Sequence, residues 1–233
     1  MGKRDEQKAI IRDRIYEAAL DLFCAQGYNA VSLSDIAKEA KVSTRTLHKY
    51  YPHKSFLLQR FSRENLIAVS DYANSLPKSL PLKDRIIQVM VFDYQQMFLL
   101  FDMSFVLWAD EDGIPPHPAD TEKSFEIMNF RYTESIYYWL IADAQERAGY
   151  EPGPNTALVA TILLGIYRHI TDLYRYSHYG KFDNNDFAIS IQMRLDSIWP
   201  SIERQLETPV APEYVKYLEE IPVSDQFMKE YLE

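Results

Sequence analysis

The stretch Ser32–Lys54, SLSDIAKEAKVSTRTLHKYYPHK, decides the fold. Its first part has apolar residues at helical spacing, and Ser34 is expected to cap that helix because a serine oxygen can accept a hydrogen bond from a free backbone N–H. After a short turn, Ser43 or Thr44 can cap a second helix. Pro52 ends this helix, since the residue before a proline is pushed out of helical geometry. Two short helices joined by such a turn predict a helix-turn-helix.

The outer face of the second helix is basic and rich in hydroxyl groups, with no acidic residue between Ser43 and Arg63. Such side chains can donate hydrogen bonds to guanine or phosphate acceptors. The alternative is a solvent-exposed amphipathic hairpin within a helical bundle, but this helix is too short to bury much apolar surface. The candidate DNA-binding residues are Ser32, Ser43, Thr44, Arg45, Thr46, His48, Lys49, Tyr50 and Lys54.

Residues Arg12–Phe61 resemble the DNA-binding domain of TetR-type transcriptional regulators. The matching pieces are AALDLF, Gly27-Tyr28, Ile36-Ala37, Val42-Ser43, Thr46-Leu47, Tyr50-Tyr51, Pro52 and Lys54. The resemblance implies a repressor that a small-molecule effector releases from a palindromic operator. Members often carry glycine where this chain has Lys41, so Lys41 is expected to adopt a positive backbone angle. Members typically carry tyrosine where this chain has His48.

Charge is divided unevenly along the chain, whose net charge is −9. Residues 1–60 contain 11 Lys and Arg against 7 Asp and Glu, whereas residues 61–233 contain 14 against 27. The basic end can approach phosphate while the acidic remainder is repelled, which would orient the protein on a duplex. A hydrophobic content of 47%, only 7 glycines and little strand-like alternation favour an all-α fold.

Helical periodicity and the positions of Pro and Gly predict the remaining elements. We expect helices at about residues 5–25, 55–74, 82–110, 121–148, 155–178 and 183–206, with a loop at 110–120. The expected domains are a helix-turn-helix domain at 1–54, an effector-binding and dimerisation domain at 55–208 that begins with a connecting helix at 55–76, and a C-terminal tail at 209–233.

The resemblance also implies a homodimer, because the last two long helices of each family member usually form its interface. The residues expected there are Leu158, Ile162, Gly165, Ile166, His169, Ile191, Leu195 and Ile198. An ordinary crossing of two helices within one chain is the alternative. A dimer with two-fold symmetry would read a palindromic double-stranded DNA operator.

Aromatic residues are frequent in the larger domain, where the resemblance implies an effector pocket. The candidate effector-binding residues are Tyr94, Phe98, Phe101, Phe105, Trp108, Tyr137, Tyr138, Tyr167 and Tyr174. Taken singly, each is more readily explained as plain core. A cavity with several of them would suit an aromatic or amphipathic small molecule, since buried Tyr and Trp need polar partners.

Other chemistry is not indicated by the sequence. The five histidines have no metal-ligand spacing, and no catalytic or cofactor-binding constellation is present, so we expect neither an enzyme nor a cofactor. Cys24 is expected to be a buried, inert thiol. The absence of a signal peptide and of a long apolar run predicts a cytoplasmic protein without membrane contact. The rival functions are a helical-bundle small-molecule-binding protein or enzyme without DNA binding, and a structural interaction protein.

Overall fold

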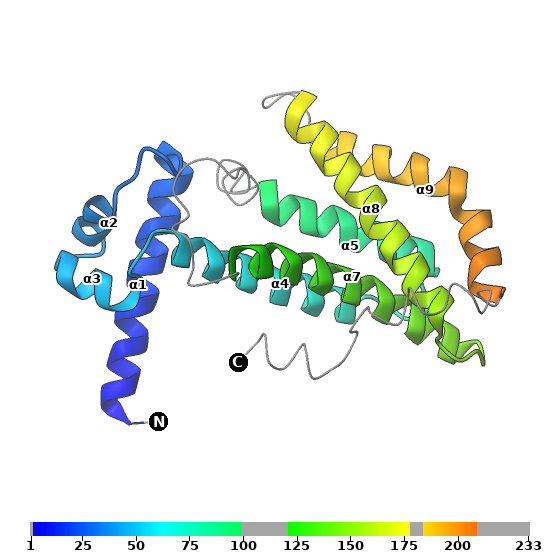
Figure 1. The fold of residues 1–233 in the computed structure, drawn as a ribbon, viewed down its shortest axis with the longest axis horizontal. Coiled ribbons are helices and arrows are strands. Elements are labelled where there is room, and N and C mark those ends of the chain that lie inside the picture. The colour runs from blue at the N-terminus through cyan, green and yellow to red at the C-terminus, as the bar shows by residue number, and fades with distance from the viewer. Residues whose placement is uncertain (1, 99–120, 178–183, 209–233) are drawn as a thin grey trace. The chain divides into compact units, whose positions relative to one another are not determined.

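The computed structural model describes residues 2–98, 121–177 and 184–208, and the side chains within them except those of 97–98, 121–131, 174–177 and 184. Every regular element in these ranges is a helix, which confirms the predicted all-α class (Figure 1). The helices are α1 (Lys3–Gln26), α2 (Leu33–Glu39), α3 (Thr44–Tyr50), α4 (Ser55–Ser75), α5 (Leu82–Phe98), α7 (Thr121–Arg147), α8 (Pro154–Ser177) and α9 (Asn184–Glu207).

The helix bounds follow the sequence signals closely. Helix α1 ends at Gln26 because Gly27 adopts a φ of 81°, a conformation that suits glycine. Helix α4 and the three helices after residue 120 lie within a few residues of their predicted bounds. The predicted end of the fifth helix, the loop at 110–120 and the tail at 209–233 lie outside the described residues. No described helix has both the length and the apolar character needed to cross a membrane.

The described residues form two compact units. The first, called the N-terminal unit, contains residues 2–64 with the described residues 96–98 and 121–126, and the second contains residues 65–95 together with the described residues from 127 onward. In the N-terminal unit, α1 packs on α2 and α2 packs on α3. Its core is assembled from side chains of all three helices and of the start of α4. The largest fully buried ones are Ile15, Ile36, Leu47, Leu57 and Leu58.

Two local predictions in the N-terminal unit are wrong. Helix α2 is capped by Ser32 and not by Ser34, because Asp35 stands three residues after Ser32 and completes a reciprocal capping box with it. Cys24 is exposed and not buried. The buried stripe of α1 reaches Phe23 at this end, and the next residue along a helix points about 100° away from it.

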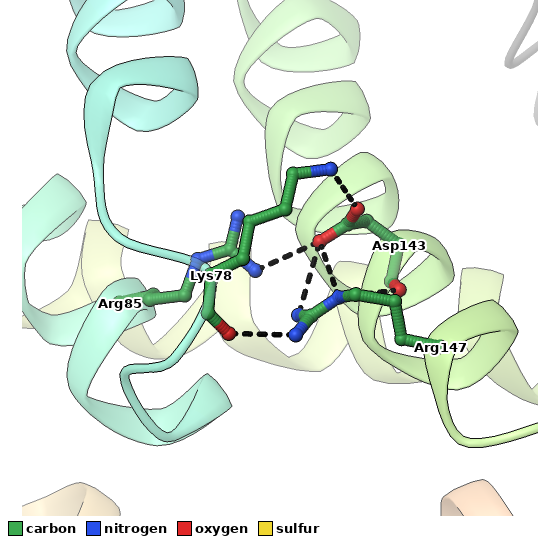
Figure 2. A network of polar contacts seen from close by, with 4 residues as sticks. All are labelled: Lys78, Arg85, Asp143 and Arg147. Atoms are coloured by element: carbon green, nitrogen blue, oxygen red, sulfur yellow. Dashed lines mark hydrogen bonds and ion pairs between the residues drawn. The ribbon is translucent and has the colours of Figure 1, made fainter.

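The second unit has its own core, formed by α5, α7, α8, α9 and the C-terminal part of α4. Figure 2 shows a network of polar contacts at its edge that joins the segment between α4 and α5 to α7. The carboxylate of Asp143 accepts hydrogen bonds from Lys78 at 2.7 Å and from Arg85 at 3.0 Å. Arg147 contacts the same carboxylate at 3.1 Å and donates to the backbone oxygen of Lys78 at 2.6 Å. The network therefore fixes the connection after α4.

Helices α8 and α9 pack on each other within the chain. Ile191 and Leu195 are fully buried in this packing, so their assignment to a surface between two subunits is wrong. Both faces of α9 carry apolar residues, and sequence spacing alone does not identify the one that meets α8. The large apolar residues left exposed on the described parts of the two helices are Ile162, Leu173, Ile189 and Met193.

Candidate functional site

Helix α3 is a short surface helix fixed by one cap and one apolar anchor. Ser43 precedes it, and the Ser43 hydroxyl oxygen accepts a hydrogen bond from the backbone N–H of Thr46 at 3.0 Å. Leu47 is the one fully buried residue of α3 and belongs to the core of the N-terminal unit. The other side of the helix is consequently presented to solvent.

The exposed face of α3 contains Thr44, Arg45, His48 and Lys49. The side chains of Thr44, Arg45 and Lys49 make no hydrogen bond or ion pair with the described residues. His48 Nδ1 lies 3.2 Å from the backbone oxygen of Pro52. Two cations and a hydroxyl are thus available on one face with no acidic neighbour on the helix, as binding to an anionic partner requires.

Other candidates for DNA binding have polar atoms engaged within the domain. The Ser32 hydroxyl donates to the Asp35 carboxylate at 2.5 Å and accepts from the Asp35 backbone N–H at 3.2 Å. These contacts with Ser32 lower the pKa of Asp35. The hydroxyls of Ser43 and Thr46 lie 2.8 Å apart, and Tyr50 is half-buried. Ser32, Ser43 and Thr46 therefore shape the two helices directly.

Lys54 joins the start of α4 to the segment between α1 and α2. Its ammonium donates to the backbone oxygen of Tyr28 at 2.7 Å and to that of Val31 at 2.9 Å. It also lies 4.0 Å from the centre of the Tyr28 ring, close enough for a cation–π contact. Burial lowers the pKa of Lys54. One ammonium proton remains beyond these two bonds, so Lys54 braces the domain whether or not it reaches DNA.

Arg60 is a second residue that braces the N-terminal unit, and it is not predicted from the sequence. Its guanidinium lies 2.8 Å from Asp13 on α1, pairs with Glu64 on α4 at 2.8 Å and donates to the Tyr51 hydroxyl at 2.9 Å. It also covers the Tyr16 ring at 4.1 Å. Its partners on α1 and after α3 are distant in sequence. Only the spacing of Arg60 and Glu64, four residues apart on α4, could have indicated an ion pair from the sequence. Arg60 couples the first turns of α4 to α1 and to the end of α3.

The candidate effector residues fall into two groups. Tyr94, Tyr137 and Tyr167 are buried in the core of the second unit, and Tyr138 is half-buried at its edge. The Tyr94 ring stacks on Phe187 with centroids 3.6 Å apart, and Tyr167 meets Phe187 edge-on. The remaining candidates lie outside the described residues or have undescribed side chains: Phe98, Phe101, Phe105, Trp108 and Tyr174.

Asp93, a buried carboxylate on α5, is a second residue that the sequence did not predict as functional. The side-chain amide of Asn65 donates to it at 3.0 Å. Burial raises the pKa of Asp93, and the nearby Tyr167 hydroxyl and Asn65 amide oppose part of that shift. A single acid inside the apolar run IIQVMVFDYQQMF was the signal that could have found it. Among the described residues, no cluster of His, Cys, Asp or Glu is placed to hold a metal ion.

Comparison with known proteins matches both the N-terminal domain and the whole fold. Residues 15–61 match the family model described as bacterial regulatory proteins, tetR family. An uncharacterized HTH-type transcriptional regulator of Bacillus subtilis, YuxN, is 42% identical over 55 residues. That match covers 24% of this chain and only 17% of YuxN.

Two solved structures share the fold over most of the chain. A tetR-family transcriptional regulator from Streptomyces coelicolor superposes with a TM-score of 0.62 at 15% identity, covering 100% of this chain and 90% of that one. FadR of Thermus thermophilus, a TetR-family repressor in complex with lauroyl-CoA, gives a TM-score of 0.60 at 17% identity, covering 86% and 97%. With the helix-turn-helix geometry and the family model in agreement, residues 15–61 of this chain belong to the tetR family of bacterial regulatory proteins, and the described chain shares the fold of solved TetR-family regulators.

Proposed function

We propose that the protein represses transcription as a homodimer that reads a palindromic operator through α3 of each subunit and leaves it when a small molecule binds. The observation that carries DNA reading is the free basic face of α3. Thr44, Arg45 and Lys49 face solvent without partners in the described chain, while Leu47 anchors the opposite side. Electrostatic attraction to phosphate then supplies much of the affinity.

The nine candidate residues have different proposed roles. Arg45 reads a guanine in the major groove, Thr44 contacts a base or phosphate, and Lys49 binds phosphate. His48 and Tyr50 contact the DNA backbone at the end of α3. Ser32, Ser43, Thr46 and Lys54 approach phosphate from positions where their side chains already stabilise the domain.

A homodimer is supported by the apolar residues that α8 and α9 leave exposed. Ile189 and Met193 on α9 are 58% and 61% exposed, and Ile162 and Leu173 lie exposed on α8. A Cβ atom added at Gly165 would meet nothing within 4 Å, so the chain itself does not explain this mid-helix glycine. Close packing of a second copy of the chain against Gly165 would explain it. Two-fold symmetry places the operator half-sites about 34 Å apart or a multiple of that distance.

Release by a small molecule is supported by the buried aromatic residues of the second unit and by the FadR relative that holds lauroyl-CoA. The proposed effector is amphipathic or aromatic and binds near Tyr94, Tyr137 and Tyr167. Its binding favours one position of α4 and so changes the separation of the two α3 helices. In functional terms the domains are residues 1–54 for DNA, 55–208 for effector and dimerisation with 55–76 as the connecting helix, and 209–233 as a tail.

A gel shift with DNA from the protein's own promoter region tests operator reading. Arg45→Ala should weaken specific binding by about 1–3 kcal/mol and relax specificity at one base pair, because a bidentate contact with guanine is lost. Arg14→Ala, at an exposed position of α1 outside the helix-turn-helix, is the matched control and should bind as the wild type does. Equal binding by the wild type and Arg45→Ala would contradict the assigned role of α3.

A further inference from the structure

The buried carboxylate of Asp93 lacks a cationic partner. Asp93 is 5% exposed, and no ion pair among the described residues includes it. Its one hydrogen bond of normal geometry there comes from the neutral amide of Asn65. A buried charge is costly unless it is paired, so a carboxylate in this position is an unusual feature of an apolar core.

Two further polar atoms near Asp93 are buried and unsatisfied, and a third is only partly engaged. The Tyr137 hydroxyl and the side-chain oxygen of Asn65 have no hydrogen-bond partner among the described residues, and the Tyr167 hydroxyl is close enough to Asp93 to lower the pKa of that carboxyl without a hydrogen bond of normal geometry. Burial, followed by the charge of Asp93, raises the pKa of both hydroxyls, which places them within electrostatic reach of this carboxylate. Buried polar groups in proteins are nearly always satisfied, so several orphans around one charge indicate a missing partner.

The surroundings identify the chemistry of that partner. Tyr94 stacks face to face on Phe187, and Tyr167 meets Phe187 edge-on at 6.2 Å. The tyrosines Tyr137 and Tyr167 are within electrostatic reach of the Asp93 carboxylate, and a cation is attracted both by a carboxylate and by aromatic rings. A ligand carboxylate or phosphate would instead be repelled by Asp93. A hydroxyl is compatible with the acceptors but leaves the charge of Asp93 unpaired.

We infer that Asp93, Asn65, Tyr137 and Tyr167 form an anchor for the protonated amine of an amphipathic ligand. The inference rests on the proposed function, since it assigns the chemistry of the effector. The Asp93 carboxylate accepts a hydrogen bond from the ligand's ammonium group. The hydroxyl oxygens of Tyr137 and Tyr167 accept hydrogen bonds from the remaining ammonium N–H groups. The expected effector class thereby differs from the acyl-CoA held by the FadR relative.

Asn65 connects this anchor with α4. An ammonium that binds Asp93 competes with the Asn65 amide for the same carboxylate. Asn65 follows Glu64 directly, and Glu64 pairs with Arg60 at 2.8 Å. Ligand binding therefore changes the hydrogen bond that Asn65 of α4 makes with Asp93. Asn65 is the neighbour of Glu64, whose partner Arg60 braces the N-terminal unit.

The test compares dodecylamine, dodecanoate and dodecanol, each below its micelle concentration, by titration calorimetry on the full chain without DNA. Dodecylamine and dodecanoate differ only in their head groups. Dodecylamine should bind at least about tenfold more tightly, because Asp93 attracts the ammonium and repels the carboxylate. Asp93→Asn should reduce dodecylamine affinity by about tenfold or more while dodecanol affinity stays nearly unchanged. Asp84→Asn, the same change on the same helix, is the matched control and should bind all three as the wild type does.

Tyr167→Phe provides a second variant in case circular dichroism shows that Asp93→Asn does not fold. It keeps the ring and removes one anchor oxygen, so it should weaken dodecylamine more than dodecanol. The inference is overturned if dodecanoate binds as tightly as dodecylamine, if none of the three probes binds, or if neither variant alters the preference. Because no DNA is present, these outcomes are separate from a failure of operator binding in the gel shift.

Discussion

Lys54 illustrates at the residue scale how one cation can serve structure before it serves binding. Lys54→Met removes two hydrogen bonds to backbone oxygens, those of Tyr28 and Val31. Loss of these charge-assisted bonds should destabilise the protein by about 2 kcal/mol. Chemical unfolding followed by circular dichroism measures the change.

Lys49→Met is the matched control for Lys54→Met. Lys49 is exposed and makes no hydrogen bond with the described residues, so its removal should change stability by less than about 0.5 kcal/mol. It should instead lower the slope of log affinity against log salt by about one, as loss of a phosphate contact does. Equal stability of the two variants would refute the bracing role of Lys54.

Asp143 makes stability depend on acid pH. Burial alone would raise its pKa, but hydrogen bonds from Lys78 and Arg85 and the charge of Arg147 lower it to about 2. Because this folded-state value lies below the ordinary 3.8, the stabilisation is complete above the ordinary value and is lost as the pH falls toward 2. After allowance for solvent screening, the effect is about 1 kcal/mol.

Asp143→Asn separates this effect from general acid denaturation. Between about pH 5 and about pH 2.5, the wild type should lose roughly two thirds of this stabilisation, about 0.7 kcal/mol, relative to the variant, because only the wild type has this carboxylate to protonate. Denaturant titrations at both pH values measure the difference. The same loss in both proteins would mean that Asp143 contributes nothing to the pH dependence.

At the level of secondary structure, the turn between α2 and α3 contains one strained residue. Lys41 has a φ of 53°, as its place at a position often occupied by glycine predicted. Lys41→Gly should therefore stabilise the fold by up to about 1 kcal/mol. Lys38→Gly is the opposite control, since it puts glycine inside α2 and should destabilise by about 1 kcal/mol. Thermal unfolding of the two variants should shift in opposite directions.

Helix existence and most helix ends could be predicted because their signals are local. Gly27 and Pro52 act on the residues beside them, and apolar spacing marks a helix wherever it stands. The cap of α2 was misplaced although the signal was local, since two serines competed and Asp35 selected Ser32. Arg60 and Asp93 could not be assigned in the same way, because their partners come from other helices.

Assembly belongs to the scale of the whole molecule, and exposed apolar residues on α9 make it testable. Met193→Glu should convert the proposed dimer to a monomer at micromolar concentration, because a charge would be buried in the interface. Light scattering gives the mass, and operator affinity should fall with it. Trp139→Glu, at a residue 55% exposed on α7, is the control and should leave the mass unchanged. A dimer in both variants would place the interface elsewhere.

The basic and acidic parts of the chain could be read from composition, and the family resemblance of the N-terminal domain was confirmed. The inward and outward faces of α8 and α9 could not, because both helices are apolar on more than one side. Ile191 and Leu195 were assigned to the subunit interface although they fill the chain's own core. Only packing of the whole chain determines which face remains for a partner.

The exposed position of Cys24 has a practical consequence. It is the one cysteine of the chain, and it lies on α1 of the N-terminal unit. A nitroxide reagent can therefore modify each copy of the chain at a single known site, at mildly alkaline pH because the partial burial of the thiol and the charge of Asp21 raise its pKa. In the proposed dimer, pulsed electron paramagnetic resonance would then measure the distance between the two labelled Cys24 residues. Measured with and without operator DNA or amine, that distance reports whether the two N-terminal units move apart or together.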